Sequence, residues 1–108
     1  MTRSFLLALA MTLPASVALA QDDSWIAYGK QLVEANCAAC HGIGLTGDSS
    51  HPDAPPFRTL GERYPIDALE ETFVEGIFTG HPDMPQFVAT PRQINAIIDY
   101  IGSLTIKN

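Results

Sequence analysis

Apolar residues recur at helical spacing in three segments of the chain, and polar stretches rich in Gly and Pro separate these segments. The pattern predicts helices over about 24–38 and 66–75, and a third helix that begins at Pro91. The predicted fold class is therefore all-α. The expected apolar stripes comprise Trp25, Tyr28, Leu32 and Val33 in the first helix, Ile66, Leu69, Phe73 and Ile77 in the second, and Ile94, Ile97, Ile98, Ile101 and Leu104 in the third, with Tyr100 beside them.

Residues at the expected helix ends support these boundaries. The Asp-Asp-Ser run at 22–24 supplies N-cap candidates and negative charge for the first turn of the first helix. Gly76 is placed to end the second helix in a left-handed cap. Thr90 is the expected N-cap of the third helix, with Pro91 at the first helical position and Gln93 completing a capping box.

Two long loops are predicted between the helices. The first covers residues 42–63, which is longer than a small domain usually tolerates without a functional reason, and covering one face of a bound cofactor would be such a reason. The second covers residues 77–89 and contains Pro82 and Pro85.

The first twenty residues are predicted to be a cleaved export signal rather than part of the fold. A short basic start at 1–4 precedes an apolar stretch, and Ala18-Leu19-Ala20 is a small-x-small signature for cleavage before Gln21. The alternative is a retained membrane anchor, since the uncharged stretch approaches the roughly 20 residues that a span needs. Cleavage predicts one mature domain over residues 21–108 and, in a bacterium, a periplasmic location.

Charge and size narrow the function classes. The formal net charge is −6 and the pI about 4.7, which argues against nucleic acid or an anionic membrane surface as a partner. The acidic balance instead favours a redox partner with a basic docking surface. Loss of residues 1–20 from the 108-residue chain leaves 88, and loss of Arg3 changes the charge from −6 to −7. A chain this short commonly needs a disulfide, a metal or a cofactor to be stable.

The two cysteines supply the chemistry. They lie in the run Cys37-Ala38-Ala39-Cys40-His41, a C-x-x-C-H pattern that indicates covalent attachment of c-type haem. Each thiol adds across one haem vinyl group to form a thioether, and two intervening residues span the two vinyl positions. His41 is then carried under the ring with its imidazole directed at the iron. The sequence predicts one haem c.

Three other interpretations of the motif fit less well. A thioredoxin-type dithiol needs a βαβ context, and no nearby segment alternates like a buried strand. A structural zinc site needs about four ligands, and because only His51 and His81 could join the motif, it would lack thiolates. A disulfide across two residues closes too small a loop to stabilise the chain much.

Met84 is the candidate for the second axial ligand. Met and His are the usual choices, and Met84 is the only methionine of residues 21–108. A lone Met more often fills a core, but a loop flanked by prolines is an unusual place for core filling. His81 is the competing ligand, although it and His51 both precede a Pro-Asp pair that is typical of a solvated surface turn. For the haem propionates, Arg58, Tyr64 and Trp25 are available donors, each more typical of a surface or packing role.

Two segments together resemble the small class I cytochromes c. One is the C-x-x-C-H run, and the other is residues 80–87, which look like the family's G-x-x-x-M-P-x-F ligand loop. Gly29 and Tyr100 are similar to the family's first-helix glycine and to the last-helix aromatic that packs against it. The resemblance covers nearly all of residues 29–104. It implies three or four helices wrapped around one haem, with His41 and Met84 on opposite faces.

The resemblance also implies a partner for the imidazole. Ala54-Pro55 is similar to the family's Gly-Pro or Ala-Pro pair, whose proline carbonyl accepts a hydrogen bond from the haem-ligating His. The loop is slightly longer here than in the shortest members, so Pro55 and Pro56 both remain possible. The acidic chain also departs from the lysine-ringed mitochondrial members, so a basic docking face is not carried over.

Two classes of function follow. The first is a mobile single-electron carrier, since no catalytic machinery beyond the haem is evident and a Met-ligated iron has no open position. The second is a haem-bearing subunit of a larger oxidoreductase complex, or a five-coordinate sensor or enzyme if Met84 does not ligate. The carrier, which is not an enzyme, is the prediction.

Overall fold

The computed structural model describes residues 6–12, 17–75 and 82–105, and over these residues it contains helices and no strand. Helix α1 spans Val17–Asn36, a 3₁₀ turn η1 spans Phe57–Thr59, α2 spans Leu60–Arg63, α3 spans Ile66–Glu75 and α4 spans Pro91–Leu104. Both α3 and α4 begin where the periodicity predicts. The predicted all-α fold is confirmed.

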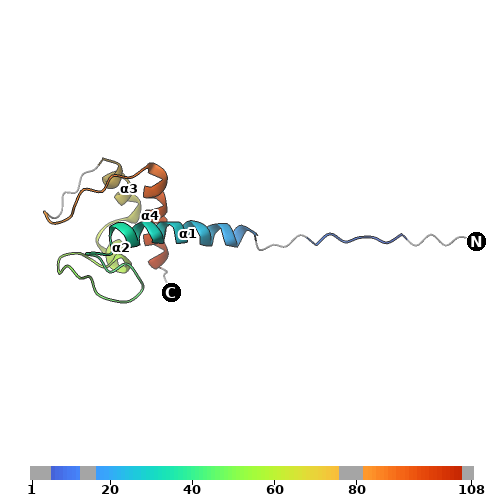
Figure 1. Cartoon of the computed structure of the whole chain (residues 1–108), viewed down its shortest axis with the longest axis horizontal. Coiled ribbons are helices and arrows are strands. Elements are labelled where there is room, and N and C mark those ends of the chain that lie inside the picture. Colours follow the sequence, from blue (N-terminus) through green and yellow to red (C-terminus); the bar gives the residue numbers. More distant parts are fainter. Residues whose placement is uncertain (1–5, 13–16, 76–81, 106–108) are drawn as a thin grey trace, which may run out of the picture.

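Helices α1 and α4 cross within the helical body (Figure 1). The crossing is close because Gly29 has no side chain. A Cβ atom at Gly29 would lie 2.1 Å from the backbone oxygen of Ala96 and 3.0 Å from Cβ of Tyr100. A glycine inside a helix costs stability relative to alanine, and here it allows two backbones to touch. Ala96 is fully buried at this contact.

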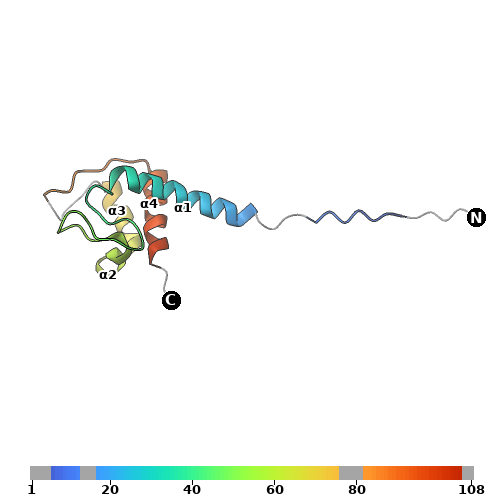
Figure 2. The same ribbon diagram turned by 60° about the horizontal axis from the view of Figure 1, so that its bottom comes forward.

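The core lies along α4. Ile97 and Ile101 are almost fully buried there against Val33 of α1, and η1 and α2 contribute Phe57 and Leu60. Helix α3 packs on another side of α4, as the second view shows (Figure 2), and none of its ten residues is buried. Its apolar stripe is half-buried at the positions that the structure describes.

The N-terminus of α4 is capped as predicted. The Thr90 hydroxyl accepts a hydrogen bond from the Gln93 backbone N–H at 3.2 Å, and the Gln93 side chain accepts one from the Thr90 backbone N–H at 3.0 Å. Pro91 occupies the first turn, where its missing N–H is not needed. This reciprocal box fixes where the helix begins.

Two boundaries differ from the prediction. Helix α1 begins at Val17 rather than near residue 24, because the alanines before Gln21 favour helix and the Asp-Asp-Ser run continues it instead of capping it. The predicted cleavage site before Gln21 therefore lies within α1. The predicted loop over 42–63 ends early, because burial of Phe57 and Leu60 winds residues 57–63 into η1 and α2. The expected Gly76 cap, Ile77 and His81 lie outside the described residues.

Residues 6–12 extend away from the helical body (Figure 1). Four large apolar side chains are exposed along this segment, namely Leu6, Leu7, Leu9 and Met11. Within the described parts of the chain, every helix is too short or too polar to cross a membrane.

Candidate functional site

The C-terminal end of α1 delivers the two thiols and the imidazole to one place. The Cys37 backbone N–H donates to the Val33 carbonyl at 2.8 Å and continues the helical pattern. The backbone N–H groups of Cys40 and His41 then both donate to the Cys37 carbonyl, at 3.2 and 3.0 Å. This tight turn keeps the three side chains together. Both cysteines are half-buried and neither forms a disulfide within the described chain.

The imidazole of His41 is fixed on one edge and one face. Its Nδ1 lies 2.8 Å from the carbonyl oxygen of Pro55, and its ring packs on the buried Phe57 at 4.9 Å between centroids. Because a carbonyl can only accept, Nδ1 carries the proton and Nε2 keeps its lone pair for a metal. Such a contact orients a ligand imidazole and raises its basicity. The contact involves Pro55 and not Pro56.

The loop after His41 is fastened back onto the motif by four hydrogen bonds. Two connect Gly42 to later parts of the loop, and two connect the motif's own carbonyls to the loop. The donor–acceptor pairs are Phe57 N to Gly42 O (2.8 Å), Gly42 N to Ser49 Oγ (2.9 Å), Ser50 Oγ to Ala39 O (2.5 Å) and His51 N to Cys40 O (3.1 Å). The Pro55 carbonyl therefore lies in a segment that these hydrogen bonds hold in place.

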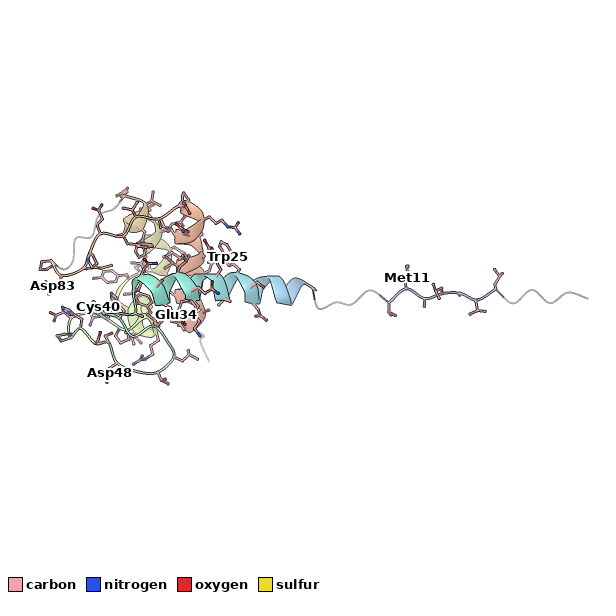
Figure 3. All side chains as sticks on the ribbon, viewed as in Figure 1. Met11, Trp25, Glu34, Cys40, Asp48 and Asp83 are labelled. Carbon is pink, nitrogen blue, oxygen red and sulfur yellow. The ribbon has the colours of Figure 1, made fainter. Side chains whose placement is uncertain are left out.

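The Met84 segment lies at the same end of the molecule. Met84 directly follows a turn at 82–83 and is 38% exposed. Asp83 places its Oδ2 3.2 Å from Nε2 of His51. Since the backbone N–H of His51 bonds to Cys40, the Met84 and Cys40 segments lie near each other, as the labelled Asp83 and Cys40 show (Figure 3). His81, the competing ligand, lies outside the described residues.

His51 does not behave as a solvated turn residue, which the Pro-Asp context had suggested. It is half-buried, its Nδ1 accepts a hydrogen bond from the Asp53 backbone N–H at 3.1 Å, and its Nε2 faces Asp83. The sequence gives the local turn, because Asp53 is two residues away. It gives no signal for the partner 32 residues later.

The propionate candidates are placed as follows. The Trp25 indole N–H donates to Asp99 at 2.7 Å, and the Arg92 guanidinium lies 5.0 Å from its ring centroid. Trp25 is twelve helical residues before Cys37, roughly 18 Å along α1, so its contacts with α4 give it a packing role. Arg58 donates to the Gly47 carbonyl at 2.5 Å and supports the first loop.

Burial affects one thiol of the motif. It raises the pKa of Cys37 from 9.0 to about 11, so the free Cys37 thiol carries its proton at neutral pH. No cluster of three or more His, Cys, Asp or Glu side chains capable of holding a metal occurs among the residues that the structure describes.

The donor set fits a haem. Two thiols separated by two residues stand beside an imidazole with one free nitrogen, and half-buried apolar side chains, among them Ile43, Leu69 and Phe87, border the core. A flat, largely apolar ring is the kind of group that partly buried apolar surface accommodates. The thiols would hold it by covalent bonds and His41 would bind its iron.

A comparison with protein families decides the matter. The cytochrome c family model matches residues 26–105, which include both cysteines, His41 and Met84. The chain belongs to the cytochrome c family. Its cysteine spacing is that of one covalently attached haem c, the group through which cytochrome c domains transfer electrons. Domains of this family are generally extracytoplasmic.

One curated relative is a haem protein of an oxidase. The chain is 33% identical over 89 residues to the cbb3-type cytochrome c oxidase subunit CcoP of Rubrivivax gelatinosus. The match covers 82% of this chain but only 29% of that subunit. No solved structure matches the chain.

Sequence reasoning missed two contributors to the site. Phe57 supports the His41 ring, and its signal is weak because the residue stands alone after two prolines in a polar segment. His51 was interpreted from its neighbours in sequence, whereas its role depends on a residue of another loop.

Proposed function

We propose that the protein is a single-electron carrier whose haem iron is bound by His41 on one face and Met84 on the other. The observation that carries the proposal is the Nδ1 contact of His41 with the Pro55 carbonyl. It leaves Nε2 as the ligand atom, directly after two cysteines at the spacing for thioethers. The haem, when bound, supplies the one-electron iron couple.

Each candidate site residue would then have a separate role in holding the haem. Cys37 and Cys40 hold the group so that it is not lost between redox partners. His41, held by Pro55 and Phe57, keeps its ring still while the iron changes charge, and this limits reorganisation. Met84 contributes a soft neutral sulfur, which favours the ferrous state and raises the reduction potential relative to a second His. Two axial side chains leave no open position for a substrate.

An absorption spectrum of the oxidised, haem-loaded protein tests the axial pair. We expect low-spin iron with a weak far-red charge-transfer band that Met84→Ala abolishes and His81→Ala leaves intact. Low-spin iron without the band in the wild type, converted to high-spin iron by His81→Ala, would assign the second ligand to His81. High-spin iron in the wild type would contradict the carrier and favour a five-coordinate sensor or enzyme.

The location and partner form part of the same proposal. The basic start, the apolar stretch and the Ala18-Leu19-Ala20 signature support cleavage of residues 1–20 after export to the periplasm. The net charge of −7 that cleavage leaves supports redox partners with basic docking surfaces. The mass of the protein recovered from a periplasmic extract tests the cleavage, because a retained leader adds twenty residues.

A second candidate is a haem-bearing subunit of a larger oxidoreductase. The similarity to the CcoP oxidase subunit favours it. Gel filtration of a native extract, followed by haem staining, separates the two candidates. A free carrier without residues 1–20 elutes below the 11.7 kDa of the full 108-residue chain, and a subunit elutes with its complex.

A further inference from the structure

We propose that His51 and Asp83 form a clamp that holds the Met84 segment against the haem-attachment segment, so that His51 is a positioning residue for the axial methionine. The inference rests on the proposed function, since it assumes that Met84 binds the iron. The contact joins Nε2 of His51 to Oδ2 of Asp83 at 3.2 Å, and Asp83 immediately precedes Met84.

The His51 side of the clamp is rigid. The His51 backbone N–H donates to the Cys40 carbonyl at 3.1 Å, and the His51 carbonyl accepts from the Ala54 N–H at 3.2 Å. The ring is fixed as well, because Nδ1 accepts from the Asp53 N–H at 3.1 Å. A ring that accepts at Nδ1 carries its proton at Nε2, and that N–H faces the Asp83 carboxylate. His51 therefore has the orientation and the proton that the contact requires.

The Met84 side has two anchors, one before the methionine and one after it. Asp83 supplies the first through His51. Phe87 supplies the second, since it packs edge-on against Phe73 of α3 at 6.4 Å between centroids and borders the core. Over residues 85–90 the chain has no regular secondary structure. The sulfur of Met84 thus sits in a short irregular segment held at both ends, and release of either end frees it to leave the iron.

The size of the effect follows from exposure. The Asp83 side chain is 65% exposed and that of His51 is 26% exposed, and contacts this close to solvent shift an equilibrium by up to about fivefold. Release of the clamp raises the fraction of molecules in which Met84 is off the iron by this factor. An external ligand that competes with Met84 then binds more tightly by the same factor.

Imidazole titration of the oxidised, haem-loaded protein tests the clamp through a double-mutant cycle. The apparent Kd is read from loss of the far-red band in the wild type, His51→Ala, Asp83→Ala and the double variant. We expect each single variant to bind imidazole about two- to fivefold more tightly. The double variant should bind no more tightly than the stronger single variant, because one contact is lost in all three. His51→Gln, whose amide N–H can donate in place of Nε2–H, should restore most of the wild-type value.

The control is Asp48→Ala. Asp48 is an exposed carboxylate of the same loop as His51, so its removal changes the net charge as Asp83→Ala does without touching the clamp. We expect its imidazole affinity to equal that of the wild type. An Asp48→Ala effect as large as that of Asp83→Ala would assign the change to charge and overturn the proposal.

The remaining outcomes are also decisive. Unchanged imidazole affinity in Asp83→Ala overturns the clamp even if His51→Ala fails to take up haem, since Asp83 is exposed enough to be replaced without loss of the fold. Single effects that multiply in the double variant overturn it too, because they indicate independent roles. A wild type without the far-red band contradicts the axial methionine itself, which separates failure of the proposed function from failure of the clamp.

Discussion

The Tyr100 hydroxyl joins the last helix to the loop that follows the haem motif. It donates to the Ile43 carbonyl at 2.6 Å, and the side chain is buried beside Gly29. Burial raises the pKa of Tyr100 above its ordinary value of 10.0, and the negative charge of Glu34 adds to the rise. The folded protein therefore keeps this proton at a pH where the unfolded chain loses it.

The pH dependence follows from the direction of that shift. The stabilisation is complete below about pH 10 and is lost as the pH rises through the higher folded-state pKa of Tyr100. We expect Tyr100→Phe to cost about 1 kcal/mol near pH 7 through the lost hydrogen bond. It should also flatten the fall of unfolding free energy above pH 10. Urea unfolding of the haem-loaded protein from pH 7 to 11 measures both, and parallel curves for the two proteins would show that Tyr100 does not contribute to the slope.

At the scale of elements, the α1–α4 crossing depends on Gly29. We expect Gly29→Ala to destabilise the protein by about 3 kcal/mol, at the upper end of the usual overpacking range, because the new methyl group would lie 2.1 Å from a backbone oxygen. Gly102→Ala is the matched control. It lies in α4 with nothing within 4 Å of its Cβ position, so the better helix propensity of alanine should leave stability equal or slightly higher. Equal urea midpoints for both variants would mean that the helices can separate without cost.

The capping box gives a second prediction for an element. Thr90→Ala removes the acceptor for the Gln93 N–H and should cost about 1 kcal/mol. Thr90→Ser keeps a hydroxyl and should cost much less. Thermal unfolding of the two variants makes the comparison. A loss as large in Thr90→Ser as in Thr90→Ala would assign the effect to the threonine methyl group rather than to the cap.

The same elements show what the sequence could predict. The bounds of α3 and the start of α4 follow from local patterns, since apolar spacing and the Thr90 cap act within a few residues. The predicted start of α1 near residue 24 was wrong, because the helix-forming alanines before the Asp-Asp-Ser run extend the helix through these capping residues. The helical turns at 57–63 were missed because burial of Phe57 and Leu60 against α4, not local propensity, winds them.

The candidate site likewise contains residues that local sequence predicts and residues that only the fold brings together. The C-x-x-C-H run predicts three functional side chains because thioether chemistry fixes the spacing of the cysteines and the histidine follows directly. The Pro55 acceptor was expected only from the family resemblance, with Pro56 left open, and the 2.8 Å contact involves Pro55. His51 and Asp83 come together through the fold, 32 residues apart. Neither the apolar periodicity nor a sequence motif could have predicted that contact.

At the scale of the whole molecule, the net charge makes approach to the haem edge sensitive to salt. The chain carries −6, or −7 without residues 1–20, and haem propionates add to this. The Asp48 and Asp83 carboxylates lie at the same end as Cys40 (Figure 3), so part of the negative field surrounds the site itself. Such a field attracts cationic partners and repels anionic ones, and salt screens it over about 10 Å at 0.1 M.

Electron exchange with small redox reagents measures this field without a named partner. Between 0.01 and 0.5 M salt, we expect the rate with a cationic cobalt complex to fall about tenfold or more and the rate with an anionic iron cyanide to rise. Asp48→Lys should weaken the salt dependence with the cationic reagent more than Asp23→Lys does. The two variants change the net charge equally, but Asp23 is an exposed residue of α1 fourteen positions before Cys37, roughly 21 Å along the helix. Equal effects would mean that net charge alone steers the reagent. A larger effect at Asp48 would instead place the approach at the Cys40 end of the molecule, which is where a partner with a basic surface is expected to dock.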